Sequence, residues 1–127
     1  MVRVIISFAA ISGLLSVVLG AFASHGLRGK LEDRLLHAFE TGVTYQMSHS
    51  LALILLALVI AQLGRHWALS AAAGSFALGI LLFSGSLYLL ALTGMKWLGP
   101  VTPIGGVFFI AGWCLFAIGA WMRAGGA

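Results

Sequence analysis

Four long apolar runs occupy most of this 127-residue chain, and they limit its fold more than any other feature. Hydrophobic residues make up 61% of the sequence and charged residues 8%, which is far less charge than a water-soluble domain of this length carries. A helix needs about 20 apolar residues to cross the hydrocarbon of a bilayer. The sequence therefore predicts one integral membrane domain over residues 1–127, folded as an all-α four-helix bundle.

The expected spans cover residues 4–23, 42–63, 67–92 and 103–122. The first run also resembles a secretory signal, because Arg3 precedes it and Ala21-Phe22-Ala23 forms a small-x-small cleavage site. Its apolar core is longer than the ~7–15 residues of a usual signal, so we expect the segment to remain attached. With four spans, both termini lie on one side of the membrane, and the 24–41 and 93–102 connections lie on the other.

An apolar stripe runs along residues 30–41, ahead of the second span. Leu31, Leu35 and Phe39 recur every four residues and so share one face of a helix, while charged residues fill the opposite face. This pattern predicts an interfacial amphipathic helix between the first two spans. The pattern is also consistent with a helix that continues into the second span.

Polar residues gather on the side of the membrane that holds these two connections. All three acidic residues lie between positions 32 and 40, and His25, His37 and His49 bracket them. Polar groups inside a bilayer are costly and persist only with partners or a use. The candidate ligand-binding residues on this side are His25, Glu40, Tyr45, Gln46, His49, Ser84, Ser86, Tyr88, Thr102, Gly105 and Gly106.

His49 is the most deeply placed of the candidate histidines. From the helical rise of about 1.5 Å per residue, it lies at a depth similar to that of Ser84-Gly85-Ser86 in the third span. We therefore expect its side chain to point into the bundle toward these serines or Tyr88, either as a tie between helices or as a ligand or proton site. Trp113, in the middle of the last span, is expected to pack against a neighbouring helix.

Two further candidates each have two interpretations. Glu40 is either a headgroup-level carboxylate paired with a basic residue of the 28–34 segment, or part of a pocket. Thr102 and Pro103 fit the start of a helix, and Gly105 and Gly106 leave the backbone N–H groups of its first turn open to a phosphate or carboxylate. A simple tight entry into the helix explains the same glycines.

The sequence contains no motif that predicts catalysis or a bound cofactor. His37 and Glu40 have the spacing of one half of a di-metal helix motif, but the second half is missing. No HExxH, CxxC, GxSxG or phosphate-binding loop is present. Cys114, the one cysteine, sits in an apolar run as a small hydrophobic residue. We predict no catalytic residues, no metal ligands and no cofactor, which favours a non-enzymatic protein.

Charge and small residues indicate the partners. The basic residues mostly stand singly at the ends of apolar runs, as expected for side chains at lipid headgroups, so we predict membrane lipids and no nucleic acid as partners. Rows of small residues recur every four or seven positions and let helix backbones approach closely, either inside the chain or between copies in a homo-oligomer. These rows include Ser12, Ser16, Gly20 and Gly105, Gly112, Gly119.

Several longer motifs resemble a known family. They include Gly20-Ala21-Phe22, His25-Gly26-Leu27, Phe39 to Gln46, Phe83 to Tyr88 and Thr102 to Gly106. Together they are similar to the signature of the YgdD/YwdK-like proteins, small four-helix membrane proteins of unknown function. The resemblance implies a multi-pass protein of the bacterial inner membrane. It supplies no activity and no catalytic residue.

Three functions are compatible with the sequence. The first is a non-enzymatic protein whose one-sided polar pocket binds a lipid headgroup, a quinone or another small amphiphile. The second is a structural or assembly protein whose polar residues only lock helices together. The third is a metal- or proton-handling membrane protein that uses His25, Glu40 and His49.

Overall fold

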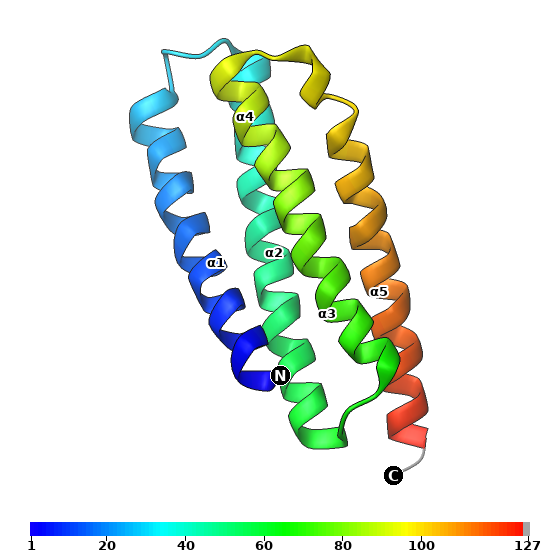
Figure 1. Cartoon of the computed structure of the whole chain (residues 1–127). Coiled ribbons are helices and arrows are strands. Elements are labelled where there is room, and N and C mark those ends of the chain that lie inside the picture. Colours follow the sequence, from blue (N-terminus) through cyan, green and yellow to red (C-terminus); the bar gives the residue numbers. More distant parts are fainter. Residues whose placement is uncertain (126–127) are drawn as a thin grey trace.

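The computed structural model describes residues 1–125, and every regular element in that range is helical (Figure 1). The α-helices are α1 (Val2–Phe22), α2 (Asp33–Leu63), α3 (Trp67–Gly79), α4 (Gly85–Thr93) and α5 (Val101–Gly125). Two π-helical turns, η1 (Ala23–Leu27) and η2 (Ile80–Ser84), and a short 3-10 helix, η3 (Lys96–Leu98), complete the chain. The all-α prediction is confirmed.

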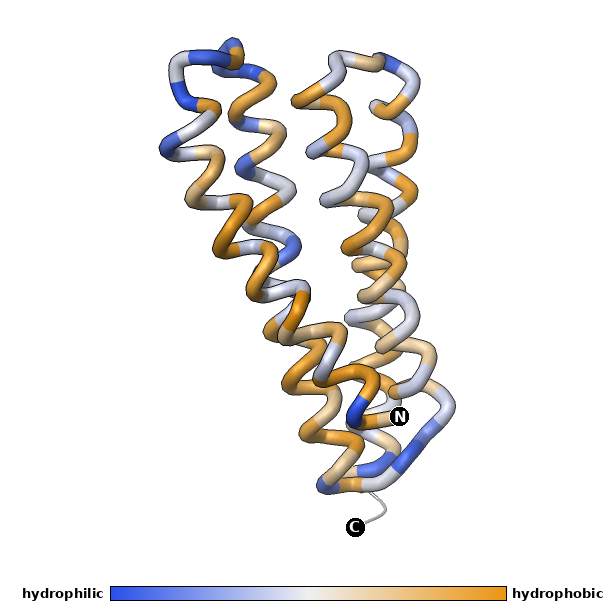
Figure 2. Tube along the Cα trace, turned by 60° about the vertical axis from the view of Figure 1, so that its left-hand side comes forward, coloured by the Kyte–Doolittle hydropathy of each residue, from blue (hydrophilic) through white to orange (hydrophobic). Residues whose placement is uncertain are grey.

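Four helical segments are long and apolar enough to cross a membrane. They are Val2–Leu27, Asp33–Leu63, Trp67–Thr93 and Lys96–Gly125. They alternate in direction, so both termini lie at one end of the bundle and the 28–32 and 94–100 connections lie at the other (Figure 1). Hydrophilic residues concentrate in the connections at the two ends (Figure 2). This distribution is the one expected of a protein whose middle is in hydrocarbon and whose ends meet water.

The amphipathic segment predicted over 30–41 is the beginning of α2 rather than a separate element. The helix starts at Asp33 and runs without a break to Leu63. Its first turns bury Leu36 and Phe39 and expose Arg34 and His37, so the predicted two-faced pattern is present. The apolar face packs on the bundle, which explains why this stretch continues the span.

Close approach between α5 and the third span depends on glycine. A Cβ atom at Gly105 would lie 2.7 Å from Cα of Phe83, and one at Gly112 would lie 2.6 Å from the ring of Phe76. At Gly119 a Cβ atom would lie 2.7 Å from the side chain of Leu69. The row of glycines spaced by seven is therefore a packing seam inside the chain.

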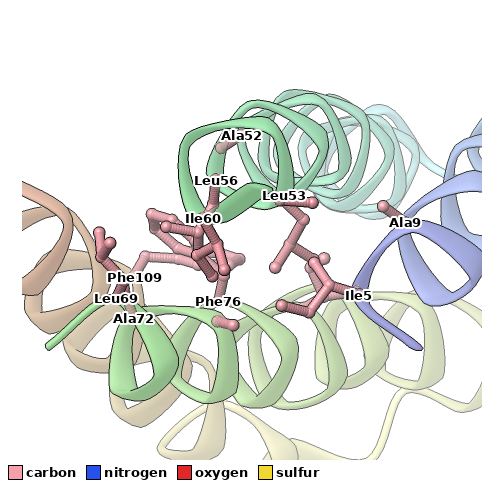
Figure 3. Close-up of a cluster of buried hydrophobic side chains, with 13 residues drawn as sticks. Ile5, Ala9, Ala52, Leu53, Leu56, Ile60, Leu69, Ala72, Phe76 and Phe109 are labelled. Atoms are coloured by element: carbon pink, nitrogen blue, oxygen red, sulfur yellow. The ribbon is translucent and has the colours of Figure 1, made fainter. Parts of the chain in front are cut away.

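A polar layer separates two apolar cores. The larger core, toward the termini, joins side chains of α1, α2, α3 and α5, with Phe76 and Leu56 fully buried (Figure 3). The smaller core, toward the 28–32 connection, is built around Phe39 and Leu36. Between the two cores lie the buried polar residues Ser12, Ser16, Gln46, His49, Ser50, Ser84 and Ser86.

Candidate functional site

Gln46 lies at the centre of the polar layer and connects three helices. Its Nε2 donates to the carbonyl oxygen of Ser12 at 3.0 Å and contacts the Ser12 hydroxyl at 3.2 Å. Its Oε1 accepts a hydrogen bond of 2.6 Å from the hydroxyl of Tyr88. Because a backbone carbonyl can only accept, the contact with Ser12 fixes the orientation of the amide. One side chain of α2 thus ties α1 to α4.

The other side chains of the polar layer are also hydrogen-bonded within the bundle. Ser50 donates to the backbone carbonyl oxygen of Gln46 at 2.6 Å, and the hydroxyls of Ser50 and Ser12 are hydrogen-bonded to each other at 2.7 Å. Ser84 donates to the carbonyl of Gly42 at 2.7 Å, which joins η2 to α2. Within residues 1–125, every buried side-chain nitrogen or oxygen has a hydrogen-bond partner. Buried polar groups with all partners present hold helices together and leave no group waiting for a ligand.

His49 points into the bundle, as predicted, but the helix to which its side chain hydrogen-bonds is α5 and not the third span. Its Nε2 accepts a hydrogen bond of 3.1 Å from the indole Nε1 of Trp113. Its ring stacks on Phe109, with centroids 3.7 Å apart and planes at 14°. The expected contact with Ser84, Ser86 or Tyr88 is therefore wrong. Equal depth in the membrane did not determine which neighbouring helix the imidazole faces.

The contacts of the imidazole with Trp113 and Tyr45 define its tautomer. The indole N–H of Trp113 can only donate, so the Nε2 of His49 that faces it must be unprotonated. The proton then sits on Nδ1, which lies 2.8 Å from the carbonyl oxygen of Tyr45 and donates to it. Protonating both nitrogens would set two donors against each other. The geometry thus specifies a neutral imidazole that ties α2 to α5.

A recess opens beside this pair, between α2 and α5. It has a volume of about 320 Å³ and is lined by Tyr45, His49, Phe83, Gly106, Phe109, Ile110 and Trp113. We call it the aromatic recess. Tyr45 is 42% exposed and Trp113 is 48% exposed, so two of its walls face the lipid side of the bundle. An apolar, aromatic hollow with few polar atoms is typical of sites for small organic molecules.

A second recess lies next to it along α2. This polar recess has a volume of about 290 Å³ and is lined by His37, Glu40, Thr41, Thr44 and Tyr45. Tyr45 lines both recesses. Together they give α2 a polar hollow nearer the 28–32 connection and an aromatic hollow farther along the helix.

Several predicted site residues lie outside these recesses. His25 is exposed in η1, Gln46 and Ser84 belong to the polar layer, and Tyr88 donates a hydrogen bond to Gln46 of that layer. Ser86 and Thr102 pair through their hydroxyls at 2.6 Å, which joins α4 to α5. Because α5 begins at Val101, Thr102 and Pro103 lie in its first turn.

The two glycines near the start of α5 differ in environment. Gly105 packs against the backbone of Phe83, whereas a Cβ atom at Gly106 would meet that ring only at 3.9 Å. Gly106 therefore lines the aromatic recess, whereas the backbone of Phe83 occupies the space beside Gly105. In the part of the chain from 1 to 125, no three His, Cys, Asp or Glu side chains are grouped to hold a metal ion, so His25, Glu40 and His49 do not form one cluster.

Sequence reasoning missed the residues on α1 and α5 that complete these contacts. Ser12 and Ser16 were visible only as a row of small residues, which predicts packing and not hydrogen bonding. The hydroxyl of Ser16 donates to the Ser12 carbonyl at 2.9 Å, and Ser12 is also hydrogen-bonded to the side chains of Gln46 and Ser50. Phe109 carried no signal beyond its hydrophobicity.

The fold and these recesses define a multi-pass membrane protein with four helical spans. The chain matches, over residues 19–106, the family described as protein of unknown function (DUF423). It belongs to this family. Among curated relatives, it is 43% identical to the UPF0382 membrane protein YwdK of Bacillus subtilis, over 93% of this chain and 96% of that protein.

Other relatives also align with most of the chain. The UPF0382 inner membrane protein YgdD of Escherichia coli is 42% identical over 93% of this chain and 89% of its own length. A UPF0382 membrane protein of Haemophilus influenzae is 43% identical over 91% of each chain. The family resemblance predicted from the motifs is thereby confirmed. No solved structure matches the chain.

Proposed function

We propose that this protein binds a small amphiphile in the two adjoining recesses of α2. The observation that carries the proposal is the change of character along one helix. His37, Glu40, Thr41 and Thr44 line a polar hollow, and Tyr45 and His49 begin an aromatic one. A molecule with a polar head and an apolar body matches that order. Lipids, quinones and other small amphiphiles all combine a polar head with an apolar body.

The recesses suit ligand binding better than the polar layer does. The layer is fully hydrogen-bonded within the described residues, so a ligand there would have to displace existing bonds. The recesses have volumes of about 290 and 320 Å³, close to the lower end of the usual range for small-molecule pockets. Tyr45 and Trp113 remain partly exposed at the aromatic recess, so an amphiphile dissolved in the bilayer can reach it sideways.

A structural role is the second candidate, and it rests on the layer itself. Gln46, Ser84 and His49 each join α2 to another helix through a buried hydrogen bond. A protein whose polar residues only lock its helices would need these bonds and no recess. His49 takes part in both candidates, but Gln46 and Ser84 belong only to the structural one and Glu40, Tyr45 and Gly106 only to the ligand-binding one, so variants at these positions separate the two.

We also propose a location and partners. The Escherichia coli relative is named an inner membrane protein, which supports placing this chain in the bacterial inner membrane as a multi-pass protein. Exposed Leu, Ile and Val side chains cover the outside of the helices and support membrane lipids as partners. Because Gly105, Gly112 and Gly119 are used inside the chain, a homo-oligomer would form through other faces.

Fluorescence of Trp113 tests the proposed site. Trp67, Trp97 and Trp121 are 69%, 66% and 81% exposed, so replacing each with Phe leaves Trp113 as the reporter in a folded protein. In nanodiscs, a neutral amphiphile with a brominated tail should quench Trp113 saturably. Gly106→Leu, which fills the recess, should abolish the saturable part. Gly13→Leu is the matched control, because no atom lies within 4 Å of a Cβ there.

Two results would contradict the proposal. One is quenching that rises linearly with the bromolipid fraction and never saturates. The other is saturable quenching that Gly106→Leu leaves unchanged. Thermal unfolding of each variant shows that it is folded, and Gly106→Val provides a smaller step if the leucine destabilises the bundle.

A further inference from the structure

We infer that the amphiphile carries a positively charged ammonium head, which is held by the carboxylate of Glu40. This inference rests on the proposed function and specifies the class of ligand. The occupant is a small amphiphilic amine with one apolar tail or ring system. Three observations on α2 lead to it.

The first observation is the isolation of Glu40. Its side chain is half-buried in the polar recess, and no hydrogen bond or ion pair satisfies it within residues 1–125. The one ion pair in that range joins Arg34 to Glu32 at 3.1 Å, and both of those side chains are well exposed. A carboxylate in a partly desolvated hollow is stabilised by a cation at hydrogen-bond distance. The alternative was an ion pair between Glu40 and a basic residue of the 28–34 segment. The described residues form no such pair.

The second observation is the absence of a fixed positive charge around the recess. Its walls are His37, Glu40, Thr41, Thr44 and Tyr45, all from α2. Neither Lys nor Arg lines the recess, so the head of an anionic amphiphile would meet Glu40 with no compensating cation. The threonine hydroxyls add hydrogen-bond acceptors for an ammonium N–H. Thr41 donates its own proton to the His37 carbonyl at 2.9 Å, which leaves its oxygen lone pairs available.

The third observation is the aromatic wall that follows the carboxylate. Tyr45 lines both recesses, and its ring packs on Phe83 with centroids 4.7 Å apart. A cation at Glu40 therefore has an aromatic side chain beside it, and cation–π attraction strengthens when the site is partly desolvated. Beyond Tyr45 the lining becomes Phe109, Ile110 and Trp113, which suits an apolar tail. Charge and hydrophobicity thus change in the order in which they change along an amphiphilic amine.

The experiment compares headgroups on one tail. Single-Trp113 protein in nanodiscs of phosphatidylcholine is titrated with four probes that share a brominated alkyl tail. Their heads are a primary ammonium, a trimethylammonium, a neutral glucoside and a sulfate. We expect the ammonium probe to bind about tenfold more tightly than the glucoside, the loss expected for one charge-assisted hydrogen bond, and the sulfate to bind most weakly.

Glu40→Gln is the decisive variant, and Asp33→Asn is its matched control, because it removes an exposed carboxylate of α2 that does not line the recess. Glu40→Gln should reduce ammonium affinity to that of the glucoside and leave glucoside binding unchanged. Asp33→Asn should keep the preference for ammonium. Circular dichroism and thermal unfolding verify that both variants are folded, as expected because neither side chain lies in the buried cores.

The outcomes separate the two proposals. Saturable binding of all probes with equal affinity, or a preference that survives Glu40→Gln, overturns the ammonium inference and leaves the amphiphile site in place. No saturable binding of any probe overturns both. Nanodiscs with phosphatidylethanolamine form a further arm. If that lipid, without added amine, displaces the ammonium probe, the occupant is a two-chain lipid and the inference of a small amine is wrong.

Discussion

Trp113 and His49 hold each other in one hydrogen-bonding state, because the indole can only donate and the facing imidazole nitrogen must accept across 3.1 Å. The bond joins two helices in a region where the hydrophobic effect does not drive helices together. His49 also stacks on Phe109 of the same helix, so one side chain makes both a polar and an aromatic contact with α5. The pair is a structural tie at the edge of the aromatic recess.

The first prediction concerns the proton on His49. Nitrogen-15 NMR of the protein in nanodiscs should show a neutral ring with the proton on Nδ1. Trp113→Phe keeps the aromatic surface and removes the donor, so the imidazole should then exchange between states. His49→Gln, whose amide oxygen can accept from the indole, should unfold at nearly the wild-type temperature, and His49→Leu should unfold at a lower one. A proton on Nε2 in the unmodified protein would contradict the tautomer.

The second prediction concerns Gln46. Replacing it with Leu removes bonds to Ser12 and Tyr88, and interhelical hydrogen bonds in membranes are worth about 0.6 kcal/mol on average and up to about 1.7. We expect Gln46→Leu to lower the free energy of unfolding by ~1–2 kcal/mol, and Tyr88→Phe to lower it by less. Both are measured by unfolding in detergent.

Tyr45→Phe is the control for Tyr88→Phe, because the Tyr45 hydroxyl has no partner within residues 1–125. It should leave stability unchanged. A double-mutant cycle of Gln46→Leu with Tyr88→Phe should give a coupling energy near the average of about 0.6 kcal/mol for such bonds. Strict additivity of the two variants would show that the bond contributes nothing.

The third prediction contrasts two neighbouring glycines. An alanine at Gly105 would press on the backbone of Phe83, while an alanine at Gly106 would make ordinary contact with its ring at 3.9 Å. Gly105→Ala should therefore destabilise the fold by ~1–3 kcal/mol, a typical cost of overpacking, and Gly106→Ala should leave it nearly unchanged. Thermal unfolding of the two proteins side by side measures the difference. Equal effects would mean that α5 does not approach η2 this closely.

The fourth prediction concerns topology. In a Cys114→Ala background, Val2→Cys and Gly125→Cys should react with a membrane-impermeant maleimide from one face of sealed vesicles. Lys30→Cys should react from the other face, because its connection lies at the opposite end of the bundle (Figure 1). Labelling of the two terminal positions from opposite faces would rule out four spans.

The sequence predicted the four helices because each span requires only a long apolar run, which is a local property. It also placed the polar residues on one side, since alternation of spans follows from their number. The hydrogen-bond partners of Gln46 could not be predicted, because Ser12 lies 34 positions away and nothing local fixes the register between two helices. The predicted partner of His49 was wrong for a related reason. The rise along a helix gives depth, while the direction of a side chain around the axis depends on neighbouring packing.

The recesses were predicted only in part. Glu40, Tyr45, His49 and Gly106 were among the candidate residues, and all four line one recess or both. Their aromatic companions were not, since Phe83, Phe109 and Trp113 look like ordinary span residues until two helices meet. Serine rows are similarly ambiguous, because the same small side chain permits close packing and supplies a hydroxyl.

The π-helical turn η2 has a consequence for how this fold can change its length. On its terminal side α3 packs against α5, and beyond the turn α4 packs against α2, so the third span passes its contacts from one neighbour to the other within Ile80–Ser84. Removing one residue there would restore a regular helix, because the i→i+5 ring of a π-helical turn holds one residue more than the i→i+4 ring of an α-helix. The helix faces before and after the turn would keep their directions, so Tyr88 would still face Gln46. A deletion in the regular part of α3 would instead rotate everything after it by about 100°, one residue's share of a 3.6-residue turn. The turn is therefore the place where the third span can lose a residue and keep both interfaces, as the exposed 28–32 connection can do between the first two spans.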